Sequence, residues 1–175
     1  MLALMEALAA IKAFVASGGP ILYWIAILAF AMWTLIFERI WFYKGALGKV
    51  KGRTVDIWES RAERNSWNSR QIRKALISRA ADKINQNLDI IGVMVTLCPL
   101  LGLLGTVTGM IEVFNVLAVT GGGDAKSMAS GVSRATIPTM AGMVAALSGV
   151  FGTTLVNRIA ERENQLLEDQ LTMDH

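Results

Sequence analysis

The chain alternates between long apolar stretches and shorter polar ones. Three stretches of 17 to 22 residues are almost entirely apolar, at Ile21–Phe37, Ile90–Ile111 and Ala135–Val156. Thr34 is the clearly polar residue of the first, and the other two contain no charge. Because about 20 residues of helix cross a hydrocarbon core of about 30 Å, the pattern predicts an all-α membrane protein with three transmembrane helices.

The residues before the first apolar stretch have a helical pattern. Four apolar residues there step by four, three and four positions: Leu4, Leu8, Ile11 and Val15. This spacing predicts a short amphipathic helix on the outer membrane–water boundary, ended by Ser17–Pro20. A cleavable signal peptide begins with a basic region, whereas Lys12 is the only cation of this segment. We therefore expect Met1 to be retained.

The apolar pattern continues beyond two of the membrane stretches. No Gly or Pro lies between Ser69 and Gly92, so we expect the second long helix to begin at Asn68 or Ser69 and to run unbroken for about 50 residues. The third is expected to continue through Leu171, and both should pack with residues 44–70 into a helical collar. Three glycines are expected to break the chain before this collar: Gly45, Gly48 and Gly52.

Basic residues are concentrated in one part of the chain. The net charge is only +3, yet 12 of the 17 Lys and Arg residues lie between Arg39 and Lys83, whereas the connection 113–131 contains only Lys126. The positive-inside rule then predicts a cytoplasmic basic segment, an outside N-terminus and an inside C-terminus. Acidic residues such as Asp56 alternate with the basic ones, so we expect a solvated face and no nucleic-acid partner.

Together these patterns divide the chain into seven expected segments. They are a periplasmic amphipathic helix at 1–19, the first transmembrane helix at 20–43, a cytoplasmic segment at 44–86, the second transmembrane helix at 87–118, a periplasmic loop at 119–130, the third transmembrane helix at 131–157 and a cytoplasmic C-terminal helix at 158–175.

Small residues recur at spacings of three and four in the second and third spans. Such spacing puts them on one helix face and allows another backbone to approach closely. We expect helix packing through Gly102, Gly105, Gly109, Gly131, Ala135, Gly142 and Gly149. Pro99 and Pro138 each remove one helical hydrogen bond within a span, and we expect them either to kink the helices or to widen a pore.

Two pairs of polar residues are expected at matched depth, because positions equidistant from the Gly121–Gly123 turn lie at similar heights in an antiparallel helix pair. The pairs are Glu112 with Arg134 and Thr106 with Thr139. One interpretation is a polar lumen with a charged ring and, about 8 to 9 Å deeper, a hydroxyl ring. The other is that the charges neutralise each other within one hairpin and the threonines bond to their own helix backbones. The spacing leaves both open.

Residues for other chemistry are scarce. The one cysteine, Cys98, lies in the second span and excludes an intrachain disulfide, and the one histidine, His175, ends the chain. No cluster of His, Cys or Ser has catalytic or metal-ligand spacing. The sequence therefore predicts no enzyme, no bound metal and no cofactor.

Two motifs in the second and third spans resemble those of a known family. They are Pro99–Met110, PLLGLLGTVTGM, and Gly131–Met143, GVSRATIPTMAGM. The chain resembles the MotA, TolQ and ExbB family of inner-membrane proton-channel subunits, and is most similar to its shorter type-2 ExbB form. The resemblance implies a multi-pass homopentamer in the lipid bilayer of the bacterial inner membrane. Its second and third helices would line a channel around an ExbD-like partner, and proton flow would drive work on TonB for outer-membrane transport.

The same resemblance implies roles for individual positions. Gly131 matches the start of the third-span motif, Thr139 its lumen threonine and Thr106 the threonine of the second-span motif. Where members of the family have a glutamate in the third span, this chain has Arg134, which cannot release a proton at neutral pH and is costly to place in a span. We therefore expect Arg134 to set the local field or to dock a partner carboxylate, and Glu112 to balance its charge.

Two other functions fit the same pattern. One is a TolQ- or MotA-like motor subunit for envelope constriction or flagellar rotation, which the three-span chain and the third-span motif favour less. The other is a non-conducting membrane scaffold whose small-residue faces only pack helices, and the presence of Arg134 supports this alternative.

Overall fold

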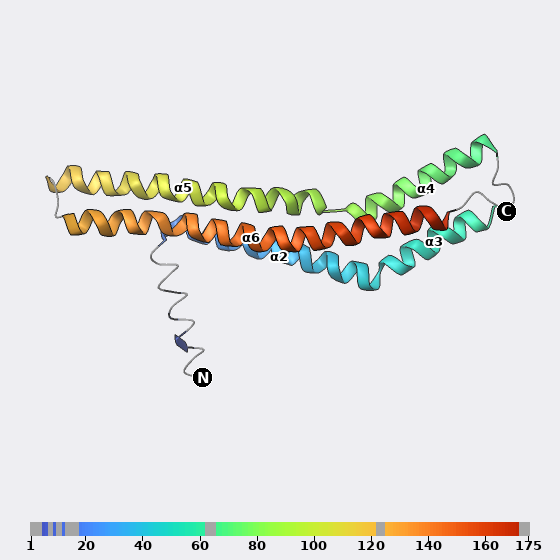
Figure 1. The fold of residues 1–175 in the computed structure, drawn as a ribbon, viewed down its shortest axis with the longest axis horizontal. Helices are drawn as coiled ribbons and strands as arrows, with labels where there is room; N and C mark the ends of the chain where they lie inside the picture. The colour runs from blue at the N-terminus through green and yellow to red at the C-terminus, as the bar shows by residue number, and fades with distance from the viewer. Residues whose placement is uncertain are drawn as a thin grey trace. The chain divides into compact units, whose positions relative to one another are not determined.

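A computed structural model of the 175-residue chain describes residues 5, 6, 9, 12, 18–61, 66–121 and 125–171. These residues form five labelled helices and contain no strand. The helices are α2 (Gly19–Gly45), α3 (Leu47–Glu59), α4 (Trp67–Asn85), α5 (Leu88–Thr120) and α6 (Ala125–Gln170) (Figure 1). The apolar pattern expected in residues 1–19, and His175, lie outside the described residues.

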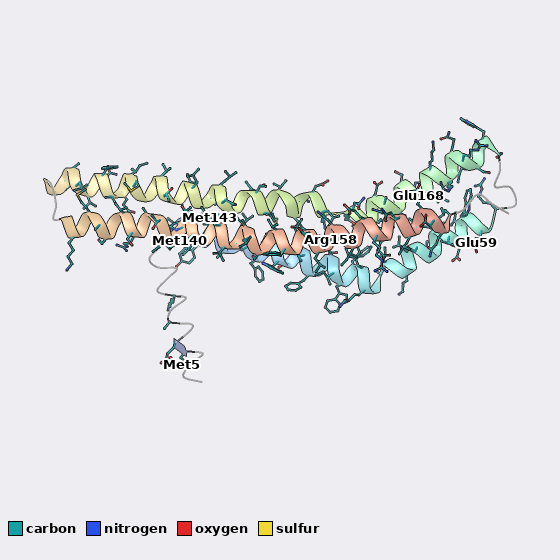
Figure 2. The ribbon with its side chains drawn as sticks, viewed as in Figure 1. Met5, Glu59, Met140, Met143, Arg158 and Glu168 are labelled. Carbon is teal, nitrogen blue, oxygen red and sulfur yellow. The ribbon has the colours of Figure 1, made fainter. Side chains whose placement is uncertain are left out.

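Three of these helices, α2, α5 and α6, have stretches long and apolar enough to cross a membrane. Their surfaces agree with this, because large apolar side chains such as Phe30, Leu100 and Leu147 are exposed along them. An apolar surface of this kind is stable only against lipid or another chain. In Figure 2, Met140 and Met143 extend from α6 in the same way. The predicted all-α class with three transmembrane helices is thus confirmed.

The chain divides into two compact units, Met1–Trp33 with Gly92–Val150 and Thr34–Ile91 with Phe151–His175. In the first unit, α5 and α6 lie side by side at backbone distance. A Cβ atom on Gly102 would lie 2.9 Å from the Pro138 carbonyl oxygen, and one on Gly142 would lie 2.5 Å from that of Cys98. Both distances are too short for a side chain, so these positions admit only glycine without a backbone shift.

The start of α2 packs against the same helix pair. The indole Nε1 of Trp33 donates a hydrogen bond of 3.3 Å to Ser148 Oγ. A Cβ atom on Gly149 would lie 2.5 Å from the sulfur of Met32, so this glycine also allows a close approach. Within the first unit, small residues of α6 therefore face both α5 and α2.

The second unit has an apolar core of its own. Its buried side chains come from α3, α4 and the end of α6, with the Leu171 that follows it: Leu47, Trp58, Ala80, Ile84, Ala160, Leu167 and Leu171. Polar contacts surround this core. Lys51 forms an ion pair with Glu163, and Arg73 donates to the carbonyl oxygens of Leu171 and Glu168. Arg158 and Glu168 are exposed on α6 (Figure 2).

Two expectations about the helices of the second unit are wrong. Gly48 and Gly52 do not break the chain, because both lie inside α3, where the cost of a helical glycine is only about 1 kcal/mol. The second long helix is not continuous either: α4 ends at Asn85, and Asn87 has a φ of 66°. Asparagine tolerates this left-handed conformation, so a helix can stop here without Gly or Pro.

Side chains from α2 donate hydrogen bonds to free backbone carbonyl groups at the C-terminal end of α4. Arg39 Nη1 donates to the backbone carbonyl of Lys83 at 3.2 Å. The hydroxyl of Tyr43 donates to the backbone carbonyl of Ile84 at 2.9 Å. The last carbonyls of a helix have no partner within the helix. The other end of α4 is capped by Ser66, whose side chain accepts from the backbone N–H of Ser69, so the helix begins just before the two expected capping positions.

Replacing Asn87 with alanine is expected to lower the free energy of unfolding by roughly 1 kcal/mol, because alanine pays the full steric cost of the left-handed conformation. Asn87→Gly should be neutral or slightly stabilising, since glycine adopts positive φ freely. The thermal midpoint of the purified protein measures both. Gln86→Ala, at a φ of −52°, is the control, and an equal loss in Asn87→Gly and Asn87→Ala would contradict the explanation.

Candidate functional site

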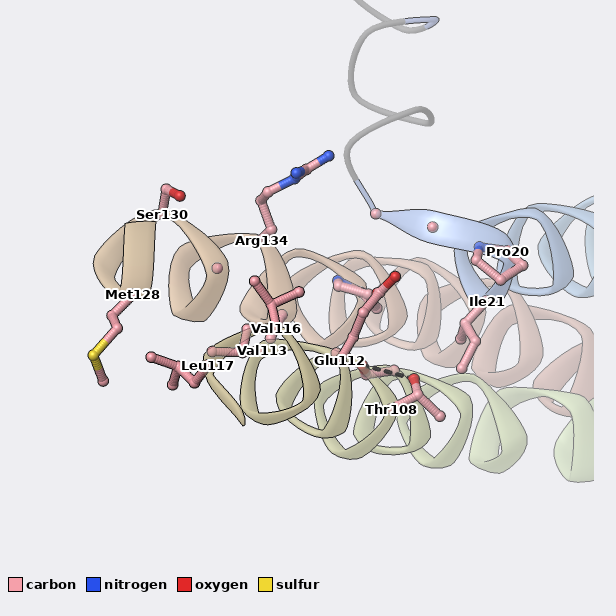
Figure 3. A pocket seen from close by; sticks show the side chains of 17 residues that line it. Pro20, Ile21, Thr108, Glu112, Val113, Val116, Leu117, Met128, Ser130 and Arg134 are labelled. Atoms are coloured by element: carbon pink, nitrogen blue, oxygen red, sulfur yellow. Dashed lines mark hydrogen bonds between the residues drawn. The ribbon is translucent and has the colours of Figure 1, made fainter. Parts of the chain in front are cut away.

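A cavity of about 740 Å³ lies in the first unit, between the start of α2 and the α5–α6 pair. Apolar and small residues form much of its wall, and two charged residues, Glu112 and Arg134, also line it. Its lining comes from three helices and includes Pro20 and Ile21 of α2, Thr108 and Val116 of α5, and Ser130 of α6 (Figure 3).

Glu112 and Arg134 line the same cavity but do not pair. In Figure 3 both side chains extend to the side of the α5–α6 pair where Pro20 lies. Within the described part of the chain, the ion pairs are Arg39 with Glu38 and Lys51 with Glu163, and neither Glu112 nor Arg134 takes part in one. Their mutual neutralisation within one hairpin is thus not what this chain forms on its own.

The two threonines of the predicted hydroxyl ring lie outside this cavity. Thr139 Oγ1 donates to the carbonyl of Gly102 across the α5–α6 contact at 3.0 Å, whereas Thr106 Oγ1 donates to Leu103 of its own helix at 2.7 Å. Thr106 therefore makes the backbone bond that one interpretation of the sequence predicts, and Thr139 makes an interhelical bond that neither interpretation includes.

The threonines are also not level with each other. A Cβ on Gly102 would lie 2.9 Å from Thr139 Cα, so Gly102 is the residue opposite Thr139. Thr106 lies four residues further along α5, about 6 Å nearer the connection to α6. The prediction of matched depth assumes that residues equidistant from the turn lie opposite each other. At Thr139 the two helices are instead shifted, so that Gly102 rather than Thr106 lies opposite it.

The charged pair and the threonine pair point in different directions. Successive helical residues are about 100° apart around the axis. Thr139 and Arg134, five residues apart, therefore differ by about 140°, and Thr106 and Glu112, six residues apart, differ by about 120°. Since Arg134 and Glu112 face the cavity beside α2, both threonines are directed away from it.

The predicted packing residues lie at the α5–α6 contact. Added Cβ atoms on four of them would collide with the partner helix: Gly105 with Pro138, Gly109 with Ala135, Gly131 with Val113, and Gly142 with Cys98. Pro99 and Pro138 both lie inside continuous helices, and Pro138 packs on Gly105 and also lines the cavity. The steric partner of Gly105 is thus the proline ring itself.

Sequence reasoning did not identify Thr108, Pro20 and Ile21 as neighbours of the charged pair. For Thr108 a signal was present, because it lies four residues before Glu112 and hence on the same helix face. Its hydroxyl donates to the carbonyls of Leu104 and Gly105 at 3.0 and 3.1 Å. The place of α2 depends on tertiary packing, which the spacing within one helix does not predict.

Groups that could hold a metal are not found in the described residues, where no three His, Cys, Asp or Glu side chains come together. Cys98 is buried at the α5–α6 contact, with its carbonyl against Gly142. The site offers fixed charge, hydroxyl groups and space.

One protein family matches most of the chain, including both motifs. The model of the MotA/TolQ/ExbB proton channel family matches residues 42–169, nearly three quarters of the chain. The matched range includes all of α5, all of α6 except its last residue, and both charged residues of the cavity. The chain therefore belongs to the MotA/TolQ/ExbB proton channel family and is a multi-pass membrane protein.

Similar proteins point to one branch of this family. The chain is 31% identical over 163 residues to the biopolymer transport protein ExbB-like 1 of Synechocystis sp., covering 74% of this chain and 64% of that protein. It is 38% identical over 90 residues to exbB1 of Vibrio cholerae, and 39% over 64 residues to ExbB of Helicobacter pylori. Those matches cover 51% and 37% of this chain, and 40% and 44% of the relatives. Within the family, the chain is an ExbB-like member.

Proposed function

We propose that the protein is a proton-channel and stator subunit of the bacterial inner membrane. With an ExbD-like partner, it would convert the proton motive force into work on TonB that energises outer-membrane transport. Membership of the MotA/TolQ/ExbB proton channel family and the biopolymer transport names of the relatives support this function. The subunit acts in a homo-oligomer, a pentamer by its resemblance to the family.

The orientation belongs to the same proposal. The part of the second unit formed by α3, α4 and the end of α6, which contains most of the basic residues, lies in the cytoplasm as the helical collar, and the connection between α5 and α6 lies in the periplasm. The separate core of the second unit supports this arrangement, because a unit that buries Trp58 and Leu167 among its own helices is stable in water.

Thr106 and Thr139 line the channel in this proposal. The single observation that supports it best is that α2 and the cavity occupy the other side of the α5–α6 pair. A channel lined by α5 and α6 is then bordered by the side away from α2, toward which both threonines point. Their hydroxyl groups can hold water or accept a bond from a protonated carboxyl of the partner.

The proton-carrying group comes from another chain. Among the described residues of Gly92–Val150, Glu112 is the one carboxylate, and it faces the cavity beside α2. Arg134 cannot exchange a proton at neutral pH. A carboxylate on the ExbD-like partner therefore completes the path, and Arg134 acts through its fixed positive charge, with Glu112 as the opposite charge in the same cavity.

Proton flux into liposomes that contain the protein and its ExbD-like partner tests this function. Flux is expected only when both proteins are present. Thr139→Val and Thr106→Val should lower it toward the partner-free background, because valine keeps the volume but removes the hydroxyl. Thr96→Val is the matched control, since Thr96 is exposed on α5 and its hydroxyl donates to Val93 of its own helix at 2.8 Å.

Two results would contradict the assignment. Wild-type flux in both threonine variants would remove these residues from the channel. No flux with the partner present would favour the non-conducting scaffold instead. Loss of TonB-dependent uptake in the variants that lose proton flux would separate this function from that of a TolQ- or MotA-like motor, whose variants would impair division or swimming.

A further inference from the structure

The cavity of the first unit lies at the level where α2 begins. Gly18, Gly19, Pro20 and Ile21 border it, and a Cβ on Gly105 would lie 3.4 Å from Ile21. Glu112 is seven residues further along α5, about 10 Å beyond that level, and Arg134 is four residues before Pro138, about 6 Å beyond it. Since α2 starts its membrane crossing here, the two charges lie at the depth of lipid headgroups.

The wall of the cavity is amphipathic. Arg134 and Glu112 supply one positive and one negative group, while Pro20, Ile21 and Pro138 supply an apolar surface on the membrane side of both charges. In the described part of the chain no ion pair or hydrogen bond involves either charged group. A complementary ligand has an anionic group for the guanidinium, a cationic group for the carboxylate and an apolar chain beside them.

The cavity lies on the side of the α5–α6 pair that α2 covers. In the proposed function α5 and α6 border the channel, so the side covered by α2 faces outward, toward lipid. This step rests on the proposed function. The charge complementarity does not, since it follows from the lining residues alone.

We infer that this cavity binds the headgroup of a zwitterionic phospholipid, phosphatidylethanolamine, in the leaflet where α2 begins. The Arg134 guanidinium holds the phosphate, as arginine does in bidentate contacts, and the Glu112 carboxylate accepts from the ammonium group. One acyl chain extends from the headgroup toward the membrane interior, along Ile21 and Pro138.

Native mass spectrometry of the oligomer purified from membranes tests this site. The protein is titrated with phosphatidylethanolamine and with phosphatidylglycerol of the same acyl chains, and we expect it to prefer phosphatidylethanolamine. Arg134→Gln should weaken binding of both lipids roughly ten- to a hundredfold, the loss of a charged hydrogen bond. Glu112→Gln should remove the preference while binding of phosphatidylglycerol stays the same or rises.

Two controls separate the site from general charge effects and from a soluble ligand. Arg158→Gln removes an exposed arginine of the second unit and should leave both affinities unchanged. Glycerophosphoethanolamine, the headgroup without acyl chains, should not compete at equal concentration. Competition by this soluble compound would overturn the lipid as the source of the zwitterion.

Other results would also overturn the inference. Equal binding of both lipids by the wild type means that the cavity holds something else, such as residues 1–17 or a second copy of the chain. An unchanged preference for phosphatidylethanolamine in Glu112→Gln would likewise overturn the inference. This result is informative even if the Arg134→Gln variant does not assemble. The assay needs neither partner nor proton gradient, so its failure and a failure of conduction are seen separately.

Discussion

Replacing Trp58 with alanine is expected to destabilise the second unit by about 3–5 kcal/mol, the usual cost of removing a large buried aromatic side chain. Trp58 is 2% exposed and lies in a core with Leu47, Ala80 and Leu167. These residues come from three helices, so the cavity left by the indole cannot close without moving a helix. Amide hydrogen exchange of Leu47–Glu59 should speed up by orders of magnitude.

Trp67→Ala is the matched control for this substitution. Trp67 is also a tryptophan at the end of a helix of the second unit, but it is 72% exposed, and a surface substitution of this kind usually changes stability by less than about 0.5 kcal/mol. If the two variants exchanged at equal rates, the apolar core would not be what holds α3 in place.

Gly142→Ala is expected to destabilise the first unit by about 3 kcal/mol, the upper end of the range for overpacking. The added methyl group would lie 2.5 Å from the carbonyl oxygen of Cys98 and 3.2 Å from Gly102 Cα. Both are backbone atoms, which cannot rotate away as a side chain can. A thermal melt in detergent should show a midpoint lower by roughly 6–12 °C for a chain of this size.

Gly92→Ala separates this collision from the intrinsic effect of glycine in a helix. Gly92 also lies inside α5, but a Cβ there would meet nothing within 4 Å. Alanine favours a helix over glycine by up to about 1 kcal/mol, so this variant should be equally or more stable than the wild type. A lower midpoint in Gly92→Ala, or an unchanged one in Gly142→Ala, would contradict the close contact of α5 with α6.

Much of the fold could be predicted because membrane crossing leaves a strong signal in the sequence. The apolar stretches at Ile21–Phe37 and Ala135–Val156 lie within α2 and α6, and helical periodicity beyond them predicts the apolar face of the second unit. The end of α4 could not be predicted, since Asn87 stops a helix by adopting positive φ, which many asparagines do not do. Gly48 shows the converse, a glycine that a helix simply accommodates.

The candidate site could be predicted only in part. The sequence indicates that Glu112 and Arg134 lie near one height, and both do line one cavity. Their unpaired state and their neighbour Pro20 depend on where α2 packs, which no spacing within α5 or α6 encodes. The level of Thr139 was missed for a related reason: the offset between two helices is decided by their contacts, such as Gly102 against Thr139, rather than by their distance from the turn.

The glycine-lined contact of α5 with α6 lowers the entropy cost of packing the two helices together. A side chain that becomes buried normally loses rotamer freedom, which costs up to about 2 kcal/mol for long residues and nothing for glycine or alanine. Gly102, Gly109, Ala135 and Gly142 meet their partners without that loss. These contacts therefore form without a cost in side-chain entropy, and the attraction there comes from dispersion between closely spaced backbones, beside the interhelical hydrogen bond that Thr139 donates to Gly102.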